Sequence, residues 1–414
     1  MTGNGETPVA VVLSAIGGYG YYYLKTIFEE IPSDKIKIAG VVDPQAENSG
    51  YFAEIKKLNI SVYNEMEDFY RDGNTADLAV ISSPIHYHVP QSCIALKNGT
   101  NVLCDKPLGA AVQEADELIR ISEQSGKWVM IGYQWSYSEA IQNLKKDILS
   151  GIFGKPVRLK ILCLWGRDDA YYQRNNWAGR MKSDDGRWIL DSPVNNAMAH
   201  FMHNMFFVIG DEKDTSAVPV SVTAECSRAN KIENYDTVSC RALTDSGTEM
   251  LFYGSHAAET EQNPVFQYEF ENAVITLGED VSGIIAVDRK GNSIRYGSPD
   301  DDHQFRKLFI AVENIRRQPP EIACGPRAAR SQTLCINGIQ ESIRKIGVFP
   351  DDIIVRNNTE KRYFVTDLDS DLINCYHKGL LPSECGIRWA QPGTKTDLTN
   401  YRFFPGGSEP GQFT

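Results

Sequence analysis

Short apolar runs alternate with amphipathic stretches along residues 1–132. The apolar runs lack the polar alternation of a half-exposed strand, which indicates strands that are buried on both faces. Such strands, separated by stretches with helical periodicity, predict an α/β domain built on a Rossmann-type, doubly wound parallel sheet. The expected strands are residues 9–13, 36–42, 78–82, 101–104 and 128–132, and the expected helices are residues 22–30, 45–58, 89–99 and 112–125.

The pattern changes after residue 132, where a few helices flank a long run of strands with turn signals. This order predicts an α+β domain with a largely antiparallel sheet over residues 133–350. Residues 351–414 contain many Gly, Pro and Asn and have weak periodicity, so we expect an irregular C-terminal extension. The elements expected in the middle segment are helices at 137–149, 195–209, 303–316 and 327–346, a strand at 157–164 and several strands within 218–296.

Composition narrows the class of protein. The 414 residues include 42 Lys and Arg against 54 Asp and Glu, a net charge of −12, which argues against a nucleic-acid partner. The N-terminus lacks the pattern of a signal peptide, and no apolar stretch is long enough to cross a membrane. Nine cysteines without a Cys-x-x-Cys pair suit a reducing compartment better than a disulfide framework or a zinc site. We therefore expect a cytoplasmic protein without a membrane partner.

A glycine-rich turn follows the first expected strand. The dinucleotide fingerprint has three glycines, and here Ala15 holds the first position while Gly17 and Gly20 hold the other two. Asp43 ends the second strand, where a carboxylate can accept both ribose hydroxyls of NAD and would repel the 2′-phosphate of NADP. The alternative is an ordinary turn at Asp43-Pro44. The residues expected to hold the cofactor at the first turn are Ile16, Gly17, Gly18, Tyr19 and Gly20.

Two polar segments follow the next two expected strands, namely Ser83-Pro84 with His88, and Asp105-Lys106-Pro107. Ligands bind at the carboxyl ends of strands in open parallel sheets, so we expect both segments at the site. Lys106 could there donate a proton or a hydrogen bond to a substrate oxygen, and burial would lower its pKa. The alternative is a solvated loop lysine.

An apolar helix near residue 200 contains His200 and His203. A buried histidine can titrate near neutrality and exchange a proton with a substrate hydroxyl. The three-residue spacing would also permit metal ligation, but no third ligand supports it, and we expect no metal. The alternative is a histidine that serves only the packing of the core.

The order of these motifs resembles that of the Gfo/Idh/MocA oxidoreductases, which include glucose–fructose oxidoreductase and inositol dehydrogenase. The shared order is the glycine turn, Asp43, Ser83-Pro84, Asp105-Lys106-Pro107 and His200, and the resemblance extends over residues 8–348. It implies a second domain with an open sheet face. In this family that face commonly forms oligomers, so we expect a homo-oligomer, either a dimer or a tetramer.

The resemblance also implies roles for individual residues. Lys106 would lie between nicotinamide and substrate, and His200 would accept the proton of the hydroxyl that is oxidised. Asn196 stands where the family has an aspartate, so it can orient a hydroxyl but cannot tune His200 as a carboxylate would. The expected catalytic residues are Lys106, His200 and Asn196. The cofactor-binding residues expected beyond the first turn are Asp43, Ser83, Pro84, His88, Asp105, Lys106 and Gln134.

The loop before the His200 helix is rich in aromatic residues and arginines. Aromatic faces pack on the C–H surfaces of sugars, and arginines donate to hydroxyls or to a carboxylate. The alternative is a packed surface or a subunit contact. The expected substrate-binding residues are Tyr172, Arg174, Trp177 and Arg180, together with Asn196 and His200.

Together these features predict an NAD-dependent oxidoreductase that acts on a hydroxyl of a sugar, cyclitol or sugar derivative. One alternative is a glycoside hydrolase or lyase that retains NAD and oxidises its substrate transiently. A second alternative is a protein that senses a dinucleotide or a sugar without turnover. The presence of both Lys106 and His200 argues against the sensor, because a sensor needs no proton relay.

Overall fold

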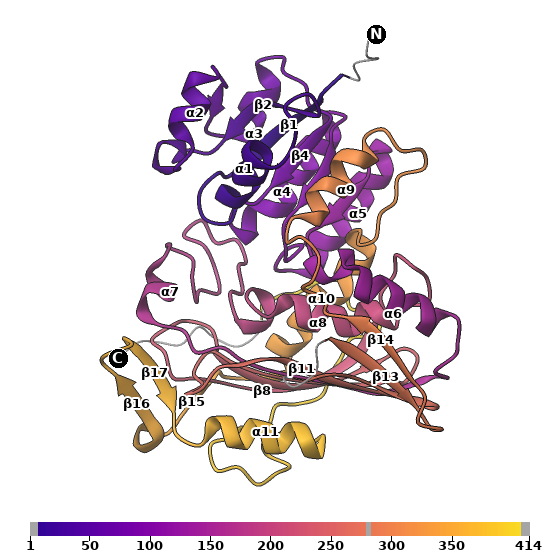
Figure 1. The fold of residues 1–414 in the computed structure, drawn as a ribbon. Helices are drawn as coiled ribbons and strands as arrows, with labels where there is room; N and C mark the ends of the chain where they lie inside the picture. The colour runs from indigo at the N-terminus through magenta and orange to yellow at the C-terminus, as the bar shows by residue number, and fades with distance from the viewer. Residues whose placement is uncertain (1–6, 279–282, 407–414) are drawn as a thin grey trace.

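The computed structural model describes residues 7–278 and 283–406, and its first sheet has six parallel strands in the order β3-β2-β1-β4-β5-β6 (Figure 1). This order confirms the Rossmann-type, doubly wound α/β domain that the buried apolar runs predicted. The strands are β1 (Val9–Ser14), β2 (Ile36–Val42), β3 (Val62–Tyr63), β4 (Leu78–Ile81), β5 (Asn101–Cys104) and β6 (Val129–Ile131), and the helices are α1 (Gly20–Glu29), α2 (Phe52–Lys57), α3 (Met66–Arg71), α4 (Ile85–Lys97) and α5 (Val112–Ser125).

The helix expected over residues 45–58 is interrupted. The chain forms a short 3₁₀ turn at Ala46–Asn48, and α2 begins only at Phe52. Between them Ser49 is extended, and its hydroxyl donates a hydrogen bond to Ile16 O at 2.9 Å. The same hydroxyl accepts a hydrogen bond from Tyr51 N at 3.4 Å, and a serine side chain that bonds to neighbouring backbone in this way offers the chain an alternative to the helix.

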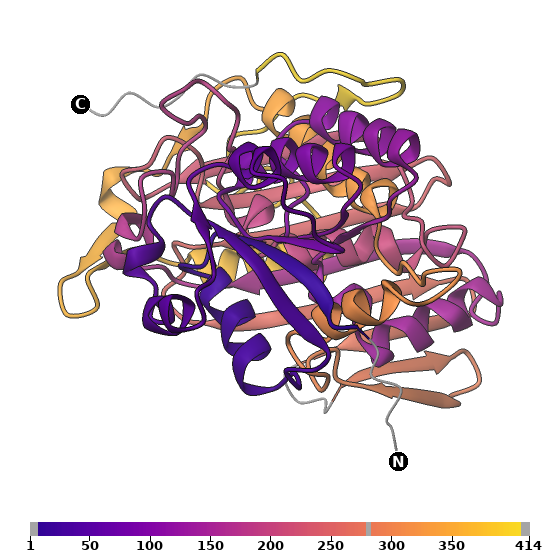
Figure 2. The same ribbon diagram turned by 90° about the horizontal axis from the view of Figure 1, so that it is seen from above.

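The second sheet has ten strands in the order β14-β13-β12-β11-β7-β10-β9-β8-β15, with β18 beside β8. Among the described strands of this second sheet, only the pairs β7–β10 and β8–β15 are parallel. The sheet is therefore largely antiparallel, as expected. Figure 2 shows the first domain lying over this sheet. The elements are α6 (Glu139–Leu149), β7 (Pro156–Leu164), α7 (Asp169–Gln173), α8 (Ala199–Val208), β8 (Pro219–Arg228), β9 (Thr237–Thr244), β10 (Glu249–Ser255), β11 (Gln262–Phe270), β12 (Ala273–Leu277), β13 (Ile284–Asp288), β14 (Ser293–Gly297), α9 (Arg306–Asn314), α10 (Pro326–Ser342) and β15 (Gly347–Val348).

Helix α10 joins the two parts of the molecule, because it contacts α5 of the first domain as well as β8 and α8 of the second. The buried Asn337 side chain of α10 accepts a hydrogen bond from Val112 N and donates one to Ala110 O, both at 2.8 Å. On the same helix, Gln332 accepts from the Tyr133 hydroxyl at 2.9 Å. Satisfied buried amides of this kind favour one arrangement of the two domains. None of the described helices is both long and apolar enough to cross a bilayer.

The C-terminal extension, expected to be irregular, is ordered over its described part. It forms a hairpin of β16 (Ile354–Asn357) and β17 (Arg362–Val365), helix α11 (Leu368–Lys378) and the short strand β18 (Thr396–Asp397). Helix α11 contacts β7 and β10 on the outer face of the large sheet, opposite α8 and α10 (Figure 1). The amphipathic stretch that forms α11 is short, which is why the weak periodicity of the segment concealed it.

Apolar contacts and ion pairs hold the extension on the sheet. Leu372 of α11 is fully buried in a cluster with Leu251 and Tyr253 of β10. Glu384 accepts hydrogen bonds from both terminal nitrogens of Arg241 in β9, at 2.6 and 2.7 Å. The face that the family resemblance implied to be open is therefore covered by the chain itself over β7 and β10. The homo-oligomer stays a prediction, and it requires another surface or the strands that α11 leaves free.

We expect the substitution Leu372→Ala to lower the free energy of unfolding by about 2–5 kcal/mol, because it leaves a cavity between α11 and the sheet. The exposed Asn374 on the same helix gives the control variant Asn374→Ala, which should change it by less than about 0.5 kcal/mol. Urea unfolding followed by circular dichroism measures both. Equal midpoints for the two variants would mean that α11 does not pack on the sheet in solution.

Candidate active site

The glycine turn joins β1 to α1. A Cβ atom on Gly20 would lie 2.0 Å from Ala15 O and 2.7 Å from Ser82 Oγ, so only glycine fits where α1 meets the strand ends. Cβ atoms on Gly17 and Gly18 would meet no described atom within 4 Å, so this side of the turn is open. Ala15, at the first fingerprint position, has a φ of +62°, which favours glycine. The turn thus keeps the fingerprint's backbone shape and leaves room for a phosphate at the start of α1.

Asp43 is half-buried at the end of β2. Its Oδ2 accepts a hydrogen bond from Ile16 N at 2.9 Å, and its Oδ1 accepts one from Gln45 N at 2.8 Å. The carboxylate is therefore fixed beside the glycine turn by two backbone amides. Each carboxylate oxygen has a second lone pair, and these can accept the two hydroxyls of a ribose. Asp43 also closes its own turn through Gln45 N. The turn interpretation is therefore correct, and it is compatible with the predicted contact to the ribose.

His88 is buried in α4 and connects the two polar turns at the strand ends. Its Nδ1 lies 2.7 Å from Pro107 O and its Nε2 lies 2.8 Å from Ser83 O. Burial lowers the pKa of His88. The Ser83 hydroxyl donates to Gln91 at 2.7 Å, and Pro84 immediately precedes α4. His88 therefore fixes the backbone of both turns, and its two ring nitrogens are already engaged by the protein.

Asp105, expected among the cofactor-binding residues, forms a buried ion pair with Lys307 of α9, with Oδ1 and Nζ 2.7 Å apart. Lys307 also donates to Gly132 O at 3.1 Å. Burial alone would lower the pKa of Lys307. Asp105 and Tyr19 raise it by more than burial lowers it, so the pKa lies above the ordinary value of lysine. Lys307 therefore stays charged at neutral pH. Lys307 had no signal in the sequence, because it lies on an ordinary amphipathic helix far from the other motifs.

Lys106 lies beside this pair and faces Asn196. Its Nζ donates to Asn196 O at 2.7 Å and lies 3.4 Å from Asn196 Oδ1. Burial is the main reason that the pKa of Lys106 falls to about 8, while Asp105 and Asp191 raise it and Lys307 and Arg174 lower it. A substantial fraction of Lys106 is therefore neutral slightly above neutral pH.

Asp191 is a buried carboxylate that the sequence did not single out. Its Oδ1 accepts from Asn196 Nδ2 at 2.7 Å, and its Oδ2 accepts from Gly179 N at 2.6 Å. Burial raises the pKa of Asp191. Asn196 thus bridges Lys106 and Asp191. Position 196 itself has no carboxylate, but Asp191 provides one directly behind it. The only signal was its position, five residues before Asn196 in the chain.

His200 is half-exposed at the start of α8, and its Nδ1 accepts a hydrogen bond from Gln134 N at 3.3 Å. Burial, and then the charges of Lys106 and Lys307, lower the pKa of His200 well below 6.5, so the ring is neutral. A neutral ring that accepts at Nδ1 carries its proton on Nε2. The side of His200 left free by Gln134 can therefore donate a hydrogen bond, and the expected role of His200 as proton acceptor stays a prediction.

One cleft of about 900 Å³ lies between the glycine turn and the second domain. Tyr19, Gln134 and His200 line it, so it brings the first turn and the His200 helix together. Lys106 donates to Asn196 O, and the next residue, Ala197, lines the cleft, so Lys106 lies behind its wall. The other lining side chains include the aromatic residues Trp135, Trp165 and Phe201 and the polar residues Arg167, Asn263, Asp300 and Gln304.

The four residues of the arginine-rich loop separate into two groups. Arg174 acts electrostatically on both Lys106 and Asp191, and Trp177 packs beside Arg174 with 5.2 Å between guanidinium carbon and ring. Tyr172 lines a small inner cavity with Asp191. Arg180 instead forms ion pairs with Asp184 and Glu233 at 2.7 and 3.3 Å, which neutralise its charge. None of these four loop residues lines the cleft with His200.

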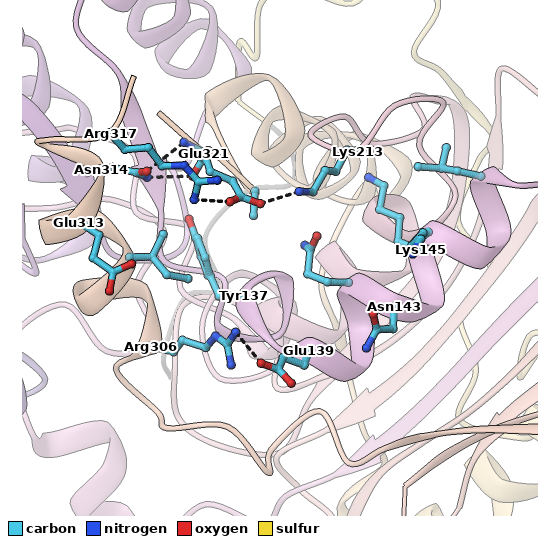
Figure 3. A pocket seen from close by; sticks show the side chains of 15 residues that line it. Tyr137, Glu139, Asn143, Lys145, Lys213, Arg306, Glu313, Asn314, Arg317 and Glu321 are labelled. Atoms are coloured by element: carbon cyan, nitrogen blue, oxygen red, sulfur yellow. Dashed lines mark hydrogen bonds and ion pairs between the residues drawn. The ribbon is translucent and has the colours of Figure 1, made fainter. Parts of the chain in front are cut away.

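A separate cavity of about 700 Å³ lies between α6 and α9 and contains none of the expected site residues (Figure 3). Three of its cationic side chains are paired, since Lys213 and Arg317 both contact Glu321, and Arg306 contacts Glu139. The cleft at His200 is the better candidate, because it contains the glycine-turn residue Tyr19 as well as Gln134 and His200.

His203 belongs to the core rather than to the cleft. Its ring stacks on Tyr133 with centroids 3.9 Å apart, and its Nε2 lies 3.0 Å from Ser136 Oγ. Burial, and then the charge of Lys145, lower the pKa of His203 from 6.5 to about 3. For this histidine the packing interpretation is correct.

The depressed pKa of His203 predicts an acid-sensitive fold. Stability is independent of this group above pH 6.5 and falls as the pH drops toward 3, because the unfolded chain binds the proton and the folded one does not. Between pH 7 and pH 5 the loss from His203 should be about 2 kcal/mol. Urea unfolding at both pH values measures the loss of unfolding free energy between pH 7 and pH 5. This loss should be smaller in His203→Gln than in the parent by about 2 kcal/mol. The exposed His377 gives the control His377→Gln, and identical pH dependence in both variants would contradict the assignment.

A family model described as an oxidoreductase family with an NAD-binding Rossmann fold matches residues 10–133. These residues are thus similar to the NAD-binding Rossmann domain of the Gfo/Idh/MocA oxidoreductases. The family model matches only residues of the first domain. The activity of the whole chain therefore has to be inferred from the geometry of the site.

Curated relatives and solved structures agree with this family. The 2,7-anhydro-N-acetylneuraminate hydratase of Mediterraneibacter gnavus is 29% identical over 143 residues, which cover 34% of this chain and 36% of the relative. Inositol 2-dehydrogenase of Rubrobacter xylanophilus is 28% identical over 158 residues, 38% of this chain and 44% of the relative. The chain thus aligns with less than half the length of either relative. The WlbA dehydrogenase of Bordetella pertussis, solved with NADH and UDP-GlcNAcA, has the same fold, with a TM-score of 0.64, 16% identity and coverage of 81% of this chain and 95% of that chain.

Proposed function

We propose that this protein is an oxidoreductase that uses NAD to oxidise a hydroxyl of a sugar, cyclitol or sugar derivative. The observation that carries the proposal is the single cleft that joins the glycine turn to His200, with Lys106 beside it. NAD, when bound, accepts the hydride from the carbon that is oxidised. The protein then has to align the hydroxyl and take its proton. Names among the relatives and fold neighbours, such as inositol 2-dehydrogenase and a structure with UDP-GlcNAcA, support substrates of this class.

In this proposal Lys106 accepts the hydroxyl proton and His200 orients the hydroxyl. Neutral Lys106 keeps its hydrogen bond to Asn196 O and has a lone pair for the substrate proton. His200 donates its Nε2 proton to the hydroxyl oxygen, since Gln134 N occupies Nδ1. Asn196 donates a hydrogen bond to the Asp191 carboxylate, which polarises the amide so that it stabilises the ammonium group that forms on Lys106. The three expected catalytic residues thus keep their place in the proposal, with the proton assigned to Lys106.

The pH profile tests this division of roles. Because the pKa of Lys106 is about 8, kcat/KM for oxidation should rise toward pH 8 and level off above it. Lys106→Met should lose about 10²–10⁴-fold in kcat, and Lys97→Met on the exposed end of α4 should lose nothing. Reduced-nicotinamide absorbance with a panel of sugars and cyclitols measures both. A rate that falls above pH 8 would mean that charged Lys106 is the active form, and would return the proton to His200.

NAD is proposed over NADP because the anchored Asp43 carboxylate would repel a 2′-phosphate. Asp43→Asn removes this charge, so the ratio of the NADP and NAD affinities should rise by about tenfold. The exposed Asp34 of the same domain gives the control Asp34→Asn, which should leave the ratio unchanged. Cofactor titrations followed by fluorescence provide both ratios, and an unchanged ratio in Asp43→Asn would place the ribose elsewhere.

A second candidate is a hydratase or lyase that retains NAD and oxidises its substrate only transiently. It is favoured by the hydratase of Mediterraneibacter gnavus among the relatives. The same proton acceptor, Lys106, serves both candidates. Product formation without net accumulation of NADH would favour the lyase, and one NADH for each product would favour the dehydrogenase.

A further inference from the structure

Two arginines pack against one tyrosine ring at the rim of the cleft. Arg167 lies in the loop after β7, and its guanidinium carbon is 4.9 Å from the centre of the Tyr171 ring. Arg174 follows α7, and its guanidinium carbon is 3.8 Å from the same ring centre. An aromatic face holds a guanidinium in place while leaving its N–H edge free to donate.

Neither guanidinium is paired with a carboxylate of the described chain. Arg174 donates to Tyr171 O, a neutral acceptor. The Nε atom of Arg167 is buried and has no described hydrogen-bond partner. A buried guanidinium N–H without an acceptor costs free energy, so Arg167 has donor capacity left for a ligand in the cleft. By contrast Arg356, which contacts the same helix α7, donates two hydrogen bonds to Asp169.

One of the two arginines, Arg167, lines the cleft together with His200. Arg174 packs on the same Tyr171 ring as Arg167, and its positive charge lowers the pKa of Lys106. The carboxylate that acts on this group is Asp191, whose two oxygens already accept from Asn196 and Gly179.

We propose that Arg167 and Arg174 bind an oxyanion on the substrate, so that the enzyme acts on an acidic sugar rather than on a neutral one. The location of this subsite rests on the proposed function, since it is the cleft at His200. A carboxylate or a phosphate accepts two parallel hydrogen bonds from a guanidinium and offsets the repulsion among Lys106, Arg167 and Arg174. The nearby faces of Trp165 and Trp135 suit the apolar side of the sugar ring.

Binding to the full-length protein with saturating NADH tests the subsite. The probes are D-glucuronate, D-glucose 6-phosphate and D-glucose, measured by calorimetry and by tryptophan fluorescence, because Trp165 lies 5.4 Å from the Arg167 guanidinium carbon. At least one acidic probe should bind about tenfold more tightly than D-glucose, and which of the two does so distinguishes a carboxylate from a phosphate. Added salt should reduce this preference.

The variants Arg167→Gln and Arg174→Gln should each lower the affinity for the acidic probe by about tenfold and leave that for D-glucose unchanged. Arg289→Gln, in the exposed turn between β13 and β14, removes the same charge away from the cleft and should change neither affinity. The exposed Arg174 serves as the second variant should Arg167→Gln not fold.

The outcomes separate this subsite from the proposed function. Acidic probes that bind no more tightly than D-glucose, or arginine variants that behave like Arg289→Gln, would overturn the subsite even if a neutral sugar is oxidised. Acidic binding that depends on Arg167, without NADH formation or product from any probe, would support the subsite and count against the oxidoreductase.

Discussion

The buried ion pair between Asp105 and Lys307 connects the parts of the molecule on which the site depends. Asp105 follows β5 of the first domain, and Lys307 comes from α9, 202 residues later. Lys307 also bonds Gly132 O after β6, so one ammonium group fixes two strand ends. Removal of either partner would leave an unpaired buried charge, which costs several kcal/mol. Since Lys106 is the next residue after Asp105, the pair also fixes where the proposed proton acceptor lies.

The electrostatics of the cleft follow from this arrangement. Burial lowers the pKa of Lys106, and the neighbouring charges partly cancel one another, so the group titrates near pH 8. Asn196 stands where the family resemblance implies a carboxylate, and Asp191 lies directly behind it and accepts a hydrogen bond from it. A negative charge is therefore present one side chain away from position 196. Arg167 and Arg174 then give the open side of the cleft an excess of positive charge, although the whole chain is acidic.

The C-terminal extension changes what the second domain can do. In place of a free sheet face, α11 and the segment around Glu384 cover β7, β9 and β10 with apolar contacts and ion pairs. The hairpin β16–β17 also reaches the loop of the substrate candidates, where Arg356 pairs with Asp169 at the start of α7. The extension thus stabilises the sheet on one side and the rim of the cleft on the other.

The sequence by itself determined the elements whose signals are local. Buried apolar strands, helical periodicity and the glycine turn with Asp43 predicted the Rossmann domain. The order of motifs predicted that Lys106 and His200 share one site. Only the tertiary structure decided which polar groups are already occupied. Arg180 forms an ion pair with Glu233, and Asp105 forms one with Lys307. The ring nitrogens of His88 face two backbone carbonyls, and Asp191 bonds to the site residue Asn196. Hydrogen bonds and ion pairs between distant segments leave no periodic trace in a sequence, because they depend on where the chain folds back.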